Sequence, residues 1–332
     1  MIRIQRLVGL ILTMSIVLFS KDITAQTNVF QAGASISDIT PFLGPPIVGG
    51  YQSPPAAYIH DPLNVRTLAL NDGKQDLIFV IVDNVSIKSE VFDAAKEIVY
   101  NDLKIPAKNI MMAATHTHSG ISLGGQGLKS KSLGLEVALD EYQTFVVRRI
   151  VDGVKMALQN KVPAQIAFGS VDVPEHVFNR RWIMKDSVMS PLGQKEIAKM
   201  NPGHSNALLR PAGPVDPEVS FIAVESNEGT PIALLANYSL HYVGGVPRGH
   251  ISADYFAAFG NRMGELLETG SSIPAFVGIM TNGTSGDVNN NDYSKPRAKE
   301  ALPPYEKIHY VANDIADKVY KKYQELDFES DV

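Results

Sequence analysis

Two histidines separated by one residue are the strongest chemical signal in this sequence. They lie in Thr115-His116-Thr117-His118-Ser119-Gly120, directly after the apolar run 110–114. Side chains alternate along an extended chain, so we expect His116 and His118 to point the same way. Two imidazoles in this arrangement form either a metal pair or a metal ligand beside a proton carrier.

Further polar side chains are expected nearby, because ligands in open α/β sheets bind beyond the carboxyl ends of strands. His241 follows an apolar run that ends at Tyr238, which makes it the best third imidazole. Asp83 follows another apolar run and is expected to bind the metal, to orient an imidazole, or to cap a helix. Asp254 is either a metal ligand or the cap of the helix that follows it.

The chain contains no cysteine, which excludes thiolate ligands, a cysteine nucleophile and disulfides. A metal must therefore be held by His, Asp, Glu, Tyr or backbone oxygens. Such a set can hold Zn²⁺ or another divalent metal. The net charge of -5 and the lack of any long Lys/Arg run argue against a nucleic-acid partner.

A glycine-containing segment, Gly283-Thr-Ser-Gly-Asp-Val-Asn289, follows the apolar run 275–280. Its glycines permit a tight turn whose exposed N–H groups suit an oxyanion or a phosphate. The glycine patterns of nucleotide-binding loops are absent, so a nucleotide is not expected. The polar run 289–292 either holds substrate or turns the chain.

Hydrophobic periodicity predicts the elements that position these residues. Strands and helices alternate, which indicates an α/β fold with a mixed β-sheet core and flanking helices. The predicted strands are 65–70, 77–82, 110–114, 165–171, 220–225, 231–238 and 275–280, and the predicted helices are 90–103, 141–159, 253–267 and 305–326. Asn71-Asp72-Gly73 predicts a hairpin turn. Two stretches without periodicity, 41–60 and 178–217, are predicted to be either functional walls or plain surface loops.

The first 25 residues have the layout of a secretory signal peptide. Arg3 and Arg6 precede the apolar run 7–19, and Ile23-Thr24-Ala25 forms a small-residue cleavage site. The apolar run is shorter than the roughly 20 residues that a transmembrane helix needs. We therefore predict a signal peptide over 1–25, a single domain over 26–332 without a transmembrane segment, and a periplasmic or secreted location.

Several motifs, in order along the chain, resemble those of the neutral/alkaline (non-lysosomal) ceramidases. The most specific is 115–120, and the others are 32–34, 38–41, 49–51, 60–66, 179–180, 237–241 and 286–288. The resemblance implies the family's N-terminal catalytic domain, in a short and divergent member without the C-terminal region. It also implies a zinc-dependent hydrolase that cleaves the amide of a lipid substrate, N-acyl sphingosine, in sphingolipid metabolism.

The resemblance and the residue chemistry together give a set of candidate site residues. The catalytic candidates are His118, Asp287 and Asn289, the substrate-binding candidates are Arg180, Asn179 and Asn282, and the metal candidates are His116, His241, Asp83 and Asp254. Asn289 stands where the family carries a serine, and an amide there can donate a hydrogen bond to an oxyanion.

Three hypotheses follow from these observations. The first is a metal-dependent hydrolase that cleaves an N-acyl amide bond with metal-activated water. The second is a hydrolase on the same scaffold that acts on a carbohydrate or another small molecule, such as a small amide. The third, motivated by Asn289, is a non-catalytic, metal-containing binding protein.

Overall fold

The computed structural model describes residues 29–124, 139–270, 273–296, 300 and 302–331. The predicted signal peptide, residues 1–25, lies outside this part of the chain. Among the described helices, none is both long enough and apolar enough to cross a bilayer.

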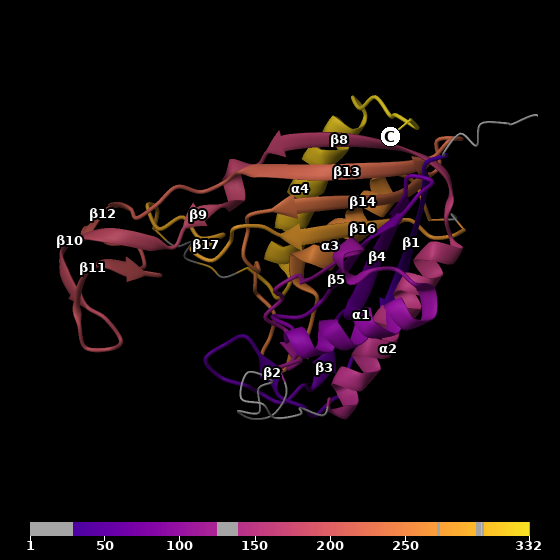
Figure 1. Cartoon of the computed structure of the whole chain (residues 1–332). Coiled ribbons are helices and arrows are strands. Elements are labelled where there is room, and N and C mark those ends of the chain that lie inside the picture. Colours follow the sequence, from indigo (N-terminus) through magenta and orange to yellow (C-terminus); the bar gives the residue numbers. More distant parts are fainter. Residues whose placement is uncertain (1–28, 125–138, 271–272, 297–299, 301, 332) are drawn as a thin grey trace, which may run out of the picture.

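An eight-stranded mixed sheet forms the centre of the fold (Figure 1). The strands are β1 (Gln31–Asp38), β4 (Asn64–Asn71), β5 (Asp76–Val82), β6 (Ile110–Ala114), β8 (Val162–Asp172), β13 (Glu218–Ser226), β14 (Pro231–Tyr238) and β16 (Val277–Asn282). Their order is β16-β14-β13-β8-β1-β4-β5-β6. Two neighbouring pairs run parallel, β5 with β6 and β14 with β16, and the other pairs are antiparallel.

The sheet folds over so that its two halves face each other. Strands β1, β4, β5 and β6 form one half, and β8, β13, β14 and β16 form the other. Leu68 and Ile81 from the first half share a buried core with Val224 and Ile279 from the second. Although β16 and β6 are opposite edges of the sheet, they lie in contact. The carboxyl ends of the two parallel pairs are thereby brought together.

Two helices cover the outer face of each half. Helices α1 (Ser89–Leu103) and α2 (Glu141–Gln159) cover the first half, and α3 (Asp254–Leu266) and α4 (Glu306–Tyr323) cover the second. The β4 sequence explains how one strand serves two cores, because Val65 and Ala69 face the helices while Leu68 faces the opposite half-sheet. The result is four layers, helix, sheet, sheet and helix, with an apolar core at each junction.

The structure confirms the mixed sheet with flanking helices, and every predicted strand and helix is present within a few residues. Strand β1 was not predicted, because it begins Gln-Ala-Gly-Ala-Ser, which has low β-propensity. Its glycine has a packing reason: a Cβ on Gly33 would lie 2.3 Å from the Ala157 carbonyl oxygen of α2.

The prediction of irregular structure over 178–217 was wrong. This stretch contains β9 (Phe178–Asn179) and a separate three-stranded sheet, made of β10 (Arg181–Met189), β11 (Lys195–Met200) and β12 (Leu208–Pro211). Figure 1 shows this sheet projecting from the main body. The predicted loop 41–60 contains the two-residue strands β2 (Ile47–Val48) and β3 (Tyr58–Ile59). Three two-stranded sheets complete the fold: β2 pairs with β7 (Gly120–Ile121), β3 with β15 (His250–Ile251), and β9 with β17 (Val288–Asn289).

Candidate metal centre

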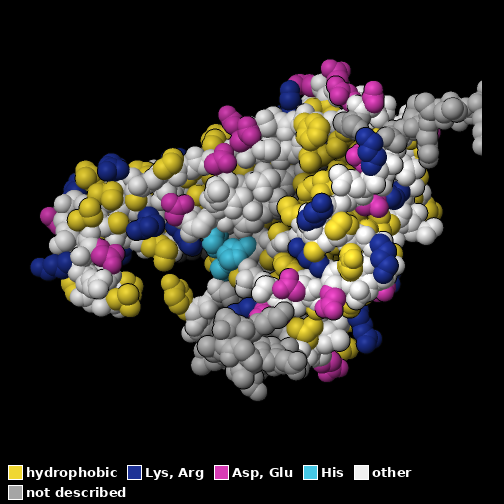
Figure 2. Space-filling model, in the orientation of Figure 1, with side chains coloured by type: hydrophobic (Ala, Val, Ile, Leu, Met, Phe, Trp, Pro, Cys, Tyr) yellow, Lys and Arg dark blue, Asp and Glu magenta, His cyan; other side chains and the backbone are white. Residues whose placement is uncertain are grey.

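Three histidines that follow strands of the two facing half-sheets lie close together. His116 and His118 follow β6, and His241 follows β14. The Nε2 atom of His116 lies 3.2 Å from that of His241 and 3.1 Å from that of His118. Among the described residues, these three form the group whose ligand atoms all lie within 4.8 Å of one another. In Figure 2, histidine side chains (cyan) are visible in the angle between the projecting sheet and the main body.

Backbone carbonyls fix the orientation of two of the rings. Nδ1 of His116 lies 2.6 Å from the carbonyl oxygen of Val85, and Nδ1 of His241 lies 2.9 Å from that of Ser285. A carbonyl only accepts hydrogen bonds, so each Nδ1 carries the proton and donates. Nε2 of both rings then carries a free lone pair, and the two Nε2 atoms lie 3.2 Å apart. This is how proteins prepare histidines to bind a metal.

The two histidines of the 116/118 pair point the same way, but strand alternation is not the cause. Strand β6 ends at Ala114, and His116 has a φ of 74°, in the left-handed region that non-glycine residues seldom adopt. The N–H of His116 donates to the carbonyl of Asn84 over 2.8 Å, which holds this turn in place. The side chains therefore converge through a strained turn that simple periodicity does not predict.

The His118 ring is held by packing on both faces. The Tyr242 ring stacks on it, with 3.9 Å between centroids and 18° between planes. The Gly49 backbone lies so close that a Cβ there would be 2.8 Å from Cγ of His118, and Gly49 has a φ of 112°. Only glycine fits both requirements without strain. The first glycine of the Gly49-Gly50-Tyr51 motif is thus explained by its proximity to His118.

Burial favours the neutral form of two of the three rings, His118 and His241. It lowers the pKa of His118 from 6.5 to about 4, assisted by the neighbouring His116 and His241. It also lowers the pKa of His241 from 6.5 to about 4, against the opposing effect of the Ser285 carbonyl. Neutral imidazole is the form that binds metals, so these two rings are ready to act as ligands at neutral pH.

The two carboxylates proposed as metal ligands do not join the histidines. Asp83 is fully buried, and its Oδ2 accepts hydrogen bonds from Nη1 of Arg66 at 2.6 Å and from the N–H of Asn64 at 2.9 Å. Strands β5 and β6 are neighbours, but the Asp83 side chain pairs with Arg66 and Asn64 of β4 instead. Asp83 thus anchors the segment whose next carbonyls, at Asn84 and Val85, position His116.

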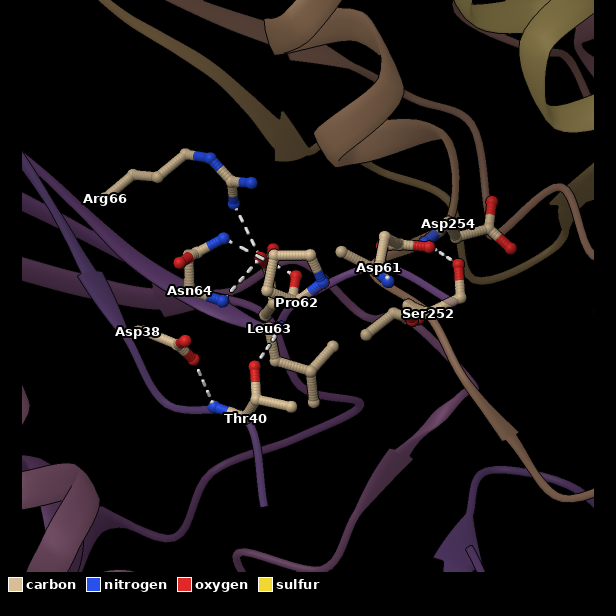
Figure 3. Close-up of polar contacts among 12 residues, drawn as sticks. Asp38, Thr40, Asp61, Pro62, Leu63, Asn64, Arg66, Ser252 and Asp254 are labelled. Carbon is tan, nitrogen blue, oxygen red and sulfur yellow. Dashed lines mark hydrogen bonds and ion pairs between the residues drawn. The ribbon is translucent and has the colours of Figure 1, made fainter. Parts of the chain in front are cut away.

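Asp254 binds backbone rather than metal. Its Oδ1 accepts from the N–H groups of Val243 at 2.8 Å and Tyr255 at 2.7 Å, and its Oδ2 accepts from that of Gly244 at 2.9 Å. Figure 3 shows it at the start of α3 beside Ser252. The carboxylate therefore accepts a hydrogen bond from an N–H group in the first turn of α3 and also holds the loop after His241. Neither Asp83 nor Asp254 offers the three imidazoles a ligand oxygen.

Asp287, Asn179 and Arg180 form a network next to the cluster. Oδ2 of Asp287 accepts from Nδ2 of Asn179 at 2.9 Å. The Arg180 N–H donates to the carbonyl of Asp287 at 2.7 Å, and its Nη2 donates to that of Gly286 at 2.6 Å. These contacts tie the base of the projecting sheet to the glycine-containing loop. The side-chain carboxylate of Asp287 thus holds the Asn179 side chain in place.

Asn289 belongs to a closed ring of side-chain hydrogen bonds. Its Nδ2 donates to Oδ1 of Asn201 at 3.2 Å and contacts the Tyr293 hydroxyl at 2.9 Å, and that hydroxyl donates to Oδ1 of Asn201 at 2.9 Å. An amide nitrogen has two hydrogens, so both are engaged, and Asn289 has none to offer an oxyanion in this arrangement. Arg180, His241 and the ring residues line a polar cavity of about 150 Å³.

Asn282 ends β16 and connects the two edges of the sheet. Its Nδ2 donates to the carbonyl of Thr115 over 3.2 Å, and its Oδ1 is buried without a hydrogen-bond partner in the described part of the chain. The sequence analysis missed Tyr242, Asn201 and Tyr293. Tyr242 had a signal, its position directly after His241, whereas the other two come from segments without periodicity.

The lowered pKa values predict a pH dependence of stability in the metal-free protein. The unfolded chain binds protons near pH 6.5 that folded His118 and His241 take up only near pH 4. Their contribution is therefore fully present above 6.5 and is lost as the pH falls towards 4. Urea unfolding with a chelator present, across this range, measures the slope. His118→Gln should give a shallower slope than the wild type, and equal slopes would contradict the assignment.

The chain is similar to known proteins in sequence and in fold. The model of the family "neutral/alkaline non-lysosomal ceramidase, N-terminal" matches residues 30–296. Similar solved structures include the neutral ceramidase from Pseudomonas aeruginosa, with 21% identity and a TM-score of 0.62, and a ceramidase complexed with C2, with 20% identity and a TM-score of 0.66. Each likeness covers 90% of this chain but 44% of the other, so this chain spans less than half their length.

At such identities the solved structures establish the fold alone, and no curated protein is matched. The family model, in contrast, extends over most of the chain and confirms the resemblance seen in its motifs. The chain belongs to the neutral/alkaline non-lysosomal ceramidase family.

Proposed function

We propose that this protein is a metal-dependent hydrolase that cleaves an N-acyl amide bond. The observation that carries the proposal is the convergence of three imidazoles: Nε2 of His116 lies 3.2 Å from that of His241 and 3.1 Å from that of His118, and the ligand atoms of all three lie within 4.8 Å of one another. Family membership supports amide hydrolysis as the reaction, with a lipid amide as the first substrate to test.

The three imidazoles fit a zinc ion. Two nitrogens bonded to one tetrahedral zinc at about 2.0–2.1 Å stand about 3.3 Å apart, close to the spacing found here. Catalytic zinc sites typically use three protein ligands and leave a position open for water or substrate. We therefore assign His118 as a third ligand, in place of the proton-carrying role expected from the sequence.

A bound zinc would supply Lewis-acid polarisation and lower the pKa of water. The residues of the chain supply positioning. Arg180 presents a guanidinium whose Nε is buried without a partner in the described residues, beside His241 in the polar cavity. It can donate a hydrogen bond to a substrate carbonyl or to a carboxylate product.

One observation favours a second candidate function, the hydrolysis of a small polar amide or a carbohydrate derivative. The cavity beside His241 has about 150 Å³ and is lined by amide, phenol and guanidinium groups. Drug-sized ligands occupy roughly 300–1,000 Å³ and bind in mostly apolar pockets. Turnover of N-acyl sphingosine, of short N-acyl amines and of N-acetylated sugars by the same preparation separates the two candidates.

The metal assignment predicts the behaviour of histidine variants. His116→Ala and His241→Ala should lose bound zinc and lower amide hydrolysis by at least about a hundredfold, because each removes a ligand. His309→Ala is the matched control, since His309 is exposed on α4 and lies outside the cluster. Metal content is measured by elemental mass spectrometry. Stoichiometric zinc in both ligand variants would refute the assignment. Wild-type protein that holds zinc but turns over none of the tested amides would favour a non-catalytic binding protein.

The hydrogen-bonded ring predicts that Asn289 acts by positioning. Asn289→Ala and Asn201→Ala should each lower kcat about tenfold with zinc content unchanged, because either substitution opens the ring. The double variant should then be no worse than either single one, which is strong coupling in a double-mutant cycle. Independent, additive losses would show instead that Asn289 contacts the substrate directly.

We further propose that residues 1–25 direct export to the periplasm or the medium. The support is the basic, then apolar, then small-residue order of that segment. Mature protein recovered outside the cytoplasm should begin at Gln26 when its N-terminus is sequenced. Recovery of uncleaved protein from the cytoplasm alone would contradict the proposal.

A further inference from the structure

The projecting sheet, residues 181–211, is built unlike the rest of the molecule. It has three strands, in the order β11-β10-β12, and Figure 1 shows it standing clear of the four helices. A sheet normally buries at least one face against another layer. Trp182 and Met184 are buried, whereas most other side chains of the sheet are exposed.

Large apolar side chains are exposed at the far end of this sheet. Leu192 is 85% exposed, Ile197 65% and Met189 62%. Leu192 lies in the tight turn that joins β10 to β11, where the N–H of Gly193 donates to the carbonyl of Ser190 over 2.9 Å. A proline at the second position favours such a turn, and Pro191 occupies it. The backbone therefore presents Leu192 outwards in a fixed geometry.

Three exposed lysines lie on β10 and β11, the strands that carry Met189 and Ile197. Lys185, Lys195 and Lys199 are all exposed, and none forms an ion pair with another described residue. The projecting sheet carries five basic residues, Arg181, Lys185, Lys195, Lys199 and Arg210, against two acidic ones, Asp186 and Glu196. The whole chain has a net charge of -5, so this basic region is opposite in sign to the rest. Figure 2 shows yellow and dark blue side chains interspersed there.

We propose that the projecting sheet docks onto an anionic lipid bilayer through a surface, termed the tip, that is formed by Lys185, Met189, Leu192, Lys195, Ile197 and Lys199. Apolar side chains flanked by lysines suit the boundary between headgroups and acyl chains, since the chains take up the apolar groups while anionic headgroups attract the ammonium groups. The acidic remainder of the molecule is repelled from such a surface, which orients the sheet towards it.

The charge pattern disfavours a second copy of the chain as the occupant. A twofold-symmetric contact places the same surface patch on both sides of the interface. Here that arrangement would set the lysines of one tip against the lysines of the other. Like charges across an interface are unfavourable, whereas an anionic bilayer neutralises them.

Docking would also place the candidate site near the lipid surface. The base of the sheet joins the site through Asn201, whose N–H donates to the carbonyl of Arg180 over 2.7 Å and whose side chain belongs to the Asn289 ring. Access to a lipid amide in the bilayer is a benefit that rests on the proposed function. The docking itself does not depend on it.

Vesicle co-sedimentation tests the proposal without any hydrolysis step. The full chain should bind vesicles of phosphatidylcholine mixed with phosphatidylglycerol, and bind pure phosphatidylcholine at least tenfold more weakly. Replacing Lys185, Lys195 and Lys199 together by glutamine should weaken binding to the anionic vesicles about a hundredfold, at roughly fivefold per residue. Leu192→Ser combined with Ile197→Ser should weaken it at least tenfold, because the apolar insertion is lost.

Phe168→Ser is the matched control, since Phe168 is 67% exposed on β8 of the main sheet, and it should bind like the wild type. Unchanged thermal unfolding and zinc content would show that the tip variants are folded. Equal binding to both kinds of vesicle, or full binding by the lysine variant, would overturn the proposal. So would a dimer that dissociates in the Leu192/Ile197 variant without any lipid binding. Protein that hydrolyses amides but does not bind vesicles would refute the docking proposal alone. Protein that binds vesicles but hydrolyses no amide would refute the proposed function alone.

Discussion

The structure depends on one electrostatic constraint, the meeting of imidazole lone pairs in a partly buried place. Because Nδ1 of both His116 and His241 donates to a carbonyl, no proton lies between their Nε2 atoms at 3.2 Å. That contact is repulsive unless a cation occupies the point of convergence. Protonating His241 would remove the repulsion but is unfavourable at neutral pH, since burial lowers its pKa to about 4. The proposed zinc ion turns the same contact into an attractive one.

The rest of the fold keeps these rings in place. His116 depends on the carbonyls of Asn84 and Val85, which follow the buried Asp83–Arg66 pair. The loop after His241 depends on the backbone contacts of Asp254. Removing one partner of a buried ion pair typically costs about 3–5 kcal/mol. Both carboxylates, expected from the sequence to be ligands, thus act on the site through the backbone that carries the ligands.

The sequence predicted the local elements well and the long-range arrangement poorly. Apolar periodicity located the strands that end before His116 and His241, and the rule for strand ends placed both histidines at the site. It did not show that the sheet folds over, because β6 and β16 are opposite edges whose contact depends on facing side chains such as Ile81 and Ile279. It also missed the projecting sheet, whose exposed strands lack the alternation that a buried face imposes.

A pattern of residue types also leaves side-chain direction undetermined, and Asn289 illustrates the consequence. The resemblance placed it where the family has a serine, which invited a catalytic reading. In the structure its amide hydrogens bind Asn201 and Tyr293, two residues from segments without periodicity. A serine hydroxyl has one hydrogen and a shorter reach, so it cannot close the same ring. The asparagine is therefore better explained as a connection between the projecting sheet and the wall of the polar cavity, and the proposed hydrolytic chemistry is assigned to the histidine cluster and Arg180.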